Sequence, residues 1–154
     1  MEDTLVGFET AKLAKECGFN ELCREGYGIN GDIKNVHYIW WKFNTTNQDI
    51  DNTNAKIKET RKVLYPDEKY EPDFICTAPT QSLLQRWLRE EHGLIISIEP
   101  TFTYALTTNV GYYAYVKKVS KEINTLEYLY LDIYFSATYE ESLEIGLLEA
   151  LKLI

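Results

Sequence analysis

The strongest structural signal in the chain is an alternation of side-chain types over residues 126–135. Successive side chains of a β-strand point to opposite faces of the sheet, so this segment would present two chemically different faces. One face would carry Leu129, Leu131, Ile133 and Phe135, and the other Tyr128, Tyr130, Asp132 and Tyr134. A period of two is typical of a sheet that is buried on one side only. We therefore expect a strand here whose apolar face is covered by helices.

Two amphipathic helices are predicted on either side of this sheet in the sequence. The first spans residues 79–91, with Thr77 or Thr80 as its N-cap and Gly93 at its end. The second spans residues 139–154 and begins with a Thr-x-x-Glu capping box. Strands are predicted at 94–99 and 111–119, with connections short enough for antiparallel pairing. Gly146 lies near the apolar stripe of the last helix, which favours close approach of a bulky side chain or a backbone.

The first half of the chain has weaker patterns. A short helix is predicted at 8–17, a strand at 36–43 and a short helix at 55–64. Residues 18–35 and 44–78 otherwise read as mostly irregular loop and linker, because they are rich in Gly, Asn and Pro. The expected architecture is a single α+β domain over residues 1–154, with an antiparallel sheet of three to four strands and helices packed on one face.

The segment from Gly26 to Gly31 has the spacing G-x-G-x-x-G of a phosphate-binding loop. In that motif a strand comes before the glycines and a helix follows them. Here no strand is predicted before Gly26, and the next patterned run, Val36 to Phe43, is typical of a strand. A nucleotide-binding loop is therefore not expected.

Charge and cysteine content limit the partners that we expect. The chain has 16 Lys and Arg against 24 Asp and Glu and a net charge of −8, which makes a general nucleic-acid binder unlikely. Residues 55–64 are the one locally basic stretch and leave a weak nucleic-acid contact open. No apolar run is long enough to span a membrane, and the N-terminus lacks the features of a signal peptide. Three cysteines, an odd number, favour a reducing cytoplasm.

No pattern in the chain predicts catalysis or metal binding. Cys17, Cys23, His37 and Cys76 are possible ligands, but their spacing matches no zinc motif, so neither a metal nor a cofactor is expected. Cys76 lies just ahead of a predicted helix, whose dipole could lower the thiol pKa, but the favoured interpretation is a half-buried cysteine in the linker. With no motif to pair a nucleophile with a base, we expect no catalytic residues. A small enzyme that uses a cysteine or acidic residues is the less favoured alternative.

The aromatic residues of the predicted strands are the best candidates for a binding surface. On a sheet, aligned tyrosines form a platform that can receive a protein or stack a base; equally, tyrosine is a good strand residue that pairs across strands. The partner would be a host protein or a second copy of the chain. The apolar surface of the last helix is interpreted first as packed between the sheet and the helix at 79–91, with a contact in a homo-oligomer as the alternative. The alternative is a small nucleotide-like ligand held between aromatic rings. The candidate residues are Tyr113, Tyr115, Tyr128, Tyr130, Tyr134, Trp40 and Trp41.

Three stretches, at residues 8–19, 78–93 and 138–154, together resemble a family of short uncharacterised proteins encoded in bacteriophage and prophage genomes. The resemblance implies a phage-related origin and, with it, a place in the host cytoplasm. It carries no catalytic or binding residue over to this chain. The function expected from the sequence is therefore non-catalytic binding.

Overall fold

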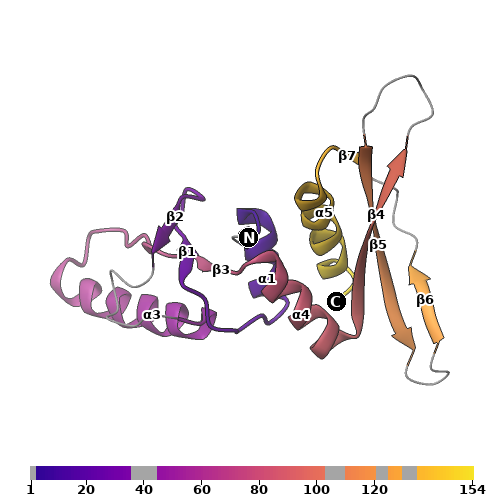
Figure 1. Cartoon of the computed structure of the whole chain (residues 1–154). Helices are drawn as coiled ribbons and strands as arrows, with labels where there is room; N and C mark the ends of the chain where they lie inside the picture. Colours follow the sequence, from indigo (N-terminus) through magenta and orange to yellow (C-terminus); the bar gives the residue numbers. More distant parts are fainter. Residues whose placement is uncertain (1–2, 36–44, 103–109, 121–124, 130–134) are drawn as a thin grey trace. The chain divides into compact units, whose positions relative to one another are not determined.

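The computed structural model describes residues 3–35, 45–102, 110–120, 125–129 and 135–154, which form a mixed α+β structure (Figure 1). These residues belong to two compact units. The C-terminal unit consists of Met1–Val6 and Thr80–Ile154, and the N-terminal unit of Gly7–Pro79. Each unit has its own antiparallel sheet, so the expectation of one sheet is wrong for the described part of the chain. The expectation of a single domain stays a prediction.

The described residues of the N-terminal unit form two helices and three short strands. Its sheet has the order β2-β1-β3 with antiparallel pairs. The predicted first helix is confirmed: it follows Gly7 and is terminated by Gly18, whose φ of 93° suits a residue without a side chain. The elements are α1 (Phe8–Glu16), β1 (Glu25–Tyr27), β2 (Ile33–Asn35), α3 (Asn47–Leu64) and β3 (Cys76–Ala78).

The glycine-rich segment forms a β-hairpin instead of a phosphate loop. Gly26 lies in β1, and the turn to β2 is closed by a hydrogen bond from Gly28 N to Asp32 O of 2.9 Å. Gly31 has a φ of 76°, and a Cβ there would lie 3.3 Å from the ring of Phe8. The prediction of loop over residues 18–35 is therefore wrong where β1 and β2 form. The predicted strand at 36–43 lies outside the described residues.

Helix α3 is longer than the sequence pattern predicted. It begins at Asn47, whereas we expected a helix only from residue 55. Thr46 and Asp49 form a capping box, in which the Thr46 hydroxyl accepts from Asp49 N and the Asp49 carboxylate accepts from Thr46 N. The description of residues 44–78 as mostly irregular is wrong, because the capping box starts the helix within a stretch whose asparagines disfavour helices.

The C-terminal unit follows the predicted order closely. Thr80 is the N-cap of the first helix, Gly93 ends it in the left-handed conformation, and Thr138 caps the last helix. Its sheet has the order β4-β5-β6, and β7 also pairs with β5. The elements are α4 (Gln81–His92), β4 (Leu94–Phe102), β5 (Val110–Ser120), β6 (Thr125–Leu129), β7 (Phe135–Ser136) and α5 (Tyr139–Leu151).

The described parts of the segment predicted as one strand over residues 126–135 belong to two strands, β6 and β7. Leu129 of β6 pairs with Val116, and Phe135 of β7 pairs with Tyr113. Residues 129 and 135 are six apart but their partners on β5 are three apart, whereas an unbroken antiparallel ladder keeps these separations equal. The prediction of one continuous strand is therefore wrong. Leu131 and Ile133 lie outside the described residues.

The core of the C-terminal unit forms where α5 packs on β4 and β5, with α4 beside α5 (Figure 1). This arrangement confirms the prediction that two helices pack against the sheet. The strands that they contact are β4 and β5, which precede the segment 126–135 in the sequence. Gly146 lets α5 approach the sheet, because a Cβ at this position would lie 2.8 Å from Cγ2 of Ile96 and 3.1 Å from Cβ of Ala114. The contact predicted for this glycine is confirmed. The buried apolar residues of the core of the C-terminal unit include Leu94, Ile96, Ala114, Val116, Leu143, Leu147 and Leu151.

Adding a methyl group at the contact between α5 and the sheet tests this packing. We expect Gly146→Ala to lower the free energy of unfolding by about 1 kcal/mol, because overpacking costs ~1–3 kcal/mol and the gain in helix propensity returns ~1 kcal/mol. In an Ile96→Ala background, where the clashing methyl is gone, the same substitution should be stabilising. Urea unfolding of the four proteins measures both effects. Stabilisation by Gly146→Ala in the otherwise native chain would contradict the close approach.

Candidate binding surfaces

Tyr113 and Tyr115 lie on the face of the sheet that α5 does not cover. In the ladder Tyr113 pairs with Glu99 and Tyr115 with Ser97, and paired residues share a face. The alternate positions Ala114 and Val116 are buried on the side of α5. Figure 1 shows α4 and α5 on the same side of β4 and β5. Both tyrosines are half-buried, so their rings lie among their neighbours with part of each surface accessible.

One other predicted aromatic residue has its position on the same face. Tyr128 pairs with Lys117 in the ladder between β6 and β5, and Lys117 lies two residues from Tyr115 on β5. Tyr112 lies on the covered side, where its ring meets that of Tyr139 edge-on with 6.3 Å between the ring centroids. The remaining candidates, Tyr130, Tyr134, Trp40 and Trp41, lie outside the described residues. The positions of Tyr113, Tyr115 and Tyr128 therefore share one face of the sheet, and Phe135, which pairs with Tyr113, adds a further aromatic position to it.

A polar cleft of about 270 Å³ lies beside the N-termini of α4 and α5. Gln81, which is buried, donates through Nε2 to the backbone oxygen of Glu140 and to the carboxylate of Glu144. Burial works to raise the pKa of Asp3, but hydrogen bonds from Ser82 and Thr80 outweigh it and lower the pKa. The cleft therefore carries an ionised carboxylate at neutral pH. Its lining includes Asp3, Gln81, Ser82, Gln85, Tyr139 and Glu140.

The N-terminal unit holds a separate network of polar side chains that begins at Asn47. This side chain is 4% exposed and joins two segments distant in sequence. Its Nδ2 donates to Phe19 O at 2.7 Å, and its Oδ1 accepts from Thr77 N at 2.8 Å. Asn47 thus hydrogen-bonds to a backbone N–H of β3 and to a backbone carbonyl of the segment after α1, and such bonds satisfy buried backbone groups.

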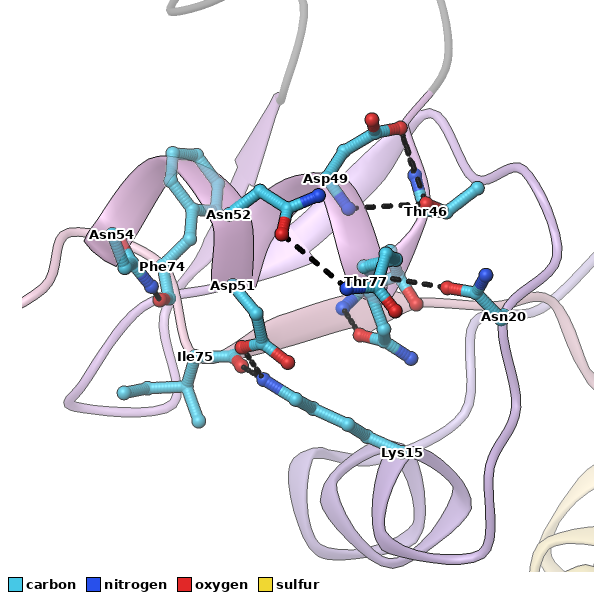
Figure 2. Close-up of polar contacts among 12 residues, drawn as sticks. Lys15, Asn20, Thr46, Asp49, Asp51, Asn52, Asn54, Phe74, Ile75 and Thr77 are labelled. Carbon is cyan, nitrogen blue, oxygen red and sulfur yellow. Dashed lines mark hydrogen bonds and ion pairs between the residues drawn. The ribbon is translucent and has the colours of Figure 1, made fainter. Parts of the chain in front are cut away.

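The same network continues along α3 and meets α1 (Figure 2). Asn54 Nδ2 donates to Phe74 O at 2.9 Å, and Lys15 Nζ donates to Ile75 O at 2.8 Å. Lys15 also forms an ion pair with Asp51. Because these donors bond to backbone oxygens and side chains of the protein itself, we assign the network to the fold and not to a ligand. Sequence reasoning missed it because residues 44–54 were expected to be loop; the Thr46–Asp49 pair was the available signal.

The thiols of Cys23 and Cys76 lack the lowered pKa that a reactive cysteine would need. Cys76 is fully buried in β3, and burial raises its pKa to about 11 although Lys15 and Lys12 lower it. Burial also raises the pKa of Cys23 to about 11. The expected half-buried linker cysteine is instead a fully buried strand residue, and its pKa is raised because the loss of hydration dominates. His37 lies outside the described residues.

Within the described ranges, no three His, Cys, Asp or Glu side chains gather in a way that would hold a metal ion. None of the helices in this part of the chain is both long and apolar enough to cross a membrane. No protein-family model, curated protein or solved structure matches this chain.

Removing the side chain of Asn47 tests its role in the network. We expect Asn47→Ala to lower the free energy of unfolding by about 2–4 kcal/mol, because it leaves two buried backbone groups unsatisfied at ~1–3 kcal/mol each. The matched control is Asn52→Ala on the exposed side of the same helix, which should cost less than about 0.5 kcal/mol. Denaturant titrations compare the two variants. Equal costs would contradict a structural role for Asn47.

The raised thiol pKa values predict an alkaline loss of stability. The folded-state pKa of Cys23 and Cys76 is about 11, above the ordinary value of 9.0, so the unfolded chain loses these protons first as the pH rises. Their contribution to stability is complete below pH 9 and is lost between about pH 9 and 11. A Cys23→Ala/Cys76→Ala variant should show a weaker decline than the native chain in this range. Parallel declines, measured by unfolding at each pH, would rule out buried neutral thiols.

Proposed function

We propose that this chain is a non-catalytic protein that acts by binding a protein partner, with Tyr113 and Tyr115 at the centre of the contact. The observation that supports the proposal is the placement of these two rings on the sheet face opposite α5. Tyrosine supplies a large, rigid contact area and a hydroxyl group that accepts or donates hydrogen bonds, which is why it is enriched in protein interfaces. The partner is a second copy of the chain or a host protein.

The residues around the two tyrosines support a protein partner. Ser97 and Glu99 pair with the two tyrosines on β4, and Phe135 pairs with Tyr113 on β7. Lys117 follows Tyr115 on the same face of β5. An aromatic centre with a polar and charged rim is the usual composition of a protein interface. The resemblance to bacteriophage and prophage proteins makes a bacterial host the natural source of a partner other than the chain itself, and the host cytoplasm the expected location.

The two alternatives from the sequence have less support. Thiol catalysis requires a thiolate, whereas burial keeps Cys23 and Cys76 protonated at neutral pH. A nucleotide-like ligand requires stacking rings and groups that accept a phosphate. The polar cleft offers the ring of Tyr139 next to the ionised carboxylate of Asp3, and a carboxylate repels phosphate. Protein binding is therefore the function that we favour.

The proposal is tested first with a second copy of the chain as the probe. We expect light scattering over a range of concentrations to show a reversible dimer, and Tyr113→Ser/Tyr115→Ser to weaken it by about tenfold or more. The control is Leu153→Ser/Ile154→Ser, which removes the exposed apolar residues at the end of the same unit and should leave the dimer intact.

The second arm uses lysate of a bacterial host as the source of partner. A captured protein counts in favour of the proposal only if its purified form binds the native chain and loses affinity with the double tyrosine variant. Circular dichroism confirms that the variants are folded. A dimer that depends on Leu153 and Ile154 in place of the tyrosines, or a chain that stays monomeric with every captured protein indifferent to the tyrosine variant, would overturn the proposal.

A further inference from the structure

Helix α3 is packed at its start and exposed along its second half. Asn47 and Ile50 are buried, whereas every residue from Lys58 to Lys69 is exposed. Short helical segments are marginal in water unless an apolar face packs against something. The second half of α3 therefore receives little tertiary support from the described residues, although it carries apolar side chains that could provide such packing.

Apolar and cationic side chains adjoin one another on this exposed half. Lys58 lies three and four residues before Arg61 and Lys62, and Arg61 lies three and four residues before Leu64 and Tyr65, spacings that make each pair neighbours on a helix surface. We call these five residues the distal face. Leu64 is 63% exposed and Tyr65 is 51% exposed. These exposed fractions are high for two large apolar side chains that follow each other in the sequence.

The charges of the distal face are not explained by the helix itself. Cations in the last turn are favourable near the C-terminal end of the helix dipole, which accounts for Arg61 and Lys62. Lys58 lies a turn earlier, three and four residues before these two cations, where like charges repel, and Glu59, three residues before Lys62, offsets only part of this repulsion. Arg61 pairs with Glu68 at 3.6 Å, but both groups are exposed, so the pair contributes little. An anionic partner would relieve this repulsion.

We propose that the distal face docks an acidic segment of a protein partner that also carries apolar or aromatic side chains. Carboxylates of the partner would meet Lys58, Arg61 and Lys62, while its apolar residues would cover Leu64 and Tyr65. A protein is favoured over a nucleic acid because the distal face joins only three cations to two exposed apolar side chains, and a phosphate backbone offers no apolar group to cover Leu64. This surface belongs to the N-terminal unit and is independent of Tyr113 and Tyr115.

The test uses the full chain and defined polymers as probes. A labelled random copolymer of Glu and Tyr should bind the native chain at about 50 mM salt, measured by fluorescence anisotropy, and bind more weakly as salt is raised. Lys58→Glu/Lys62→Glu should weaken this binding by about tenfold or more. The matched control, Lys118→Glu/Lys152→Glu, makes the same change in net charge at two exposed positions of the other unit.

The apolar part of the distal face is tested separately. Leu64→Ser/Tyr65→Ser should weaken binding of the Glu–Tyr copolymer severalfold while leaving binding of poly-glutamate unchanged, because poly-glutamate meets only the cations. All the substituted residues are exposed, so the variants should keep the native circular dichroism and melting temperature.

Three results would overturn this inference. The first is no measurable binding of the copolymer at low salt. The second is an equal loss of affinity in the charge-reversed variant and its control, which would indicate an effect of net charge alone. The third is tighter binding of a single-stranded DNA oligonucleotide than of the copolymer, lost in Lys58→Glu/Lys62→Glu, which would make the distal face a phosphate-binding surface.

Discussion

The close approach of α5 to the sheet at Gly146 determines the arrangement of the C-terminal unit. A glycine at this point lets the helix backbone come within contact distance of Ile96 and Ala114, on one face of β4 and β5. Strand periodicity then dictates that the alternate residues, Tyr113 and Tyr115, lie on the opposite face. The candidate binding surface is thus a consequence of a packing contact on the other side of the same strand.

The N-terminal unit depends on a polar contact in place of an apolar one. Asn47 is buried and bonds to the backbone at Phe19 and Thr77, so it joins three segments through hydrogen bonds. Its strands have three residues each and leave many backbone groups without ladder partners. Side-chain amides take over part of the role that a longer sheet would have. As a consequence, a single substitution at Asn47 removes the hydrogen bonds to two buried backbone groups, Phe19 O and Thr77 N, at once.

The sequence pattern was reliable where the local signals agreed with one another. Thr80 and Gly93 mark both ends of α4, and the capping residue Thr138 marks the start of α5, because caps act within a few residues of the backbone groups that they satisfy. The pattern failed where a long-range contact decided the outcome. Residues 47–54 have poor helix propensity and became helical through a capping box and buried amide contacts.

The binding surface was harder to predict than the elements that carry it. The alternation that pointed to tyrosines assumed one continuous strand, and the change of register between β6 and β7 is not visible in side-chain periodicity. The position of Tyr113 and Tyr115 could be predicted because they lie on a single strand with regular pairing. Their relation to Tyr128 depends on strand register, which the sequence pattern does not encode.

The two surfaces differ in the physical interaction on which they rely. Contacts made by Tyr113 and Tyr115 depend mainly on burial of ring area, which salt does not screen. Contacts made by Lys58, Arg61 and Lys62 depend on charges in water, which lose strength beyond about 8 Å at physiological ionic strength. Ionic strength therefore separates them: binding through the distal face weakens as salt is added, while binding through the tyrosines persists. One chain can then be assayed for both surfaces, and the salt dependence assigns each complex to its unit.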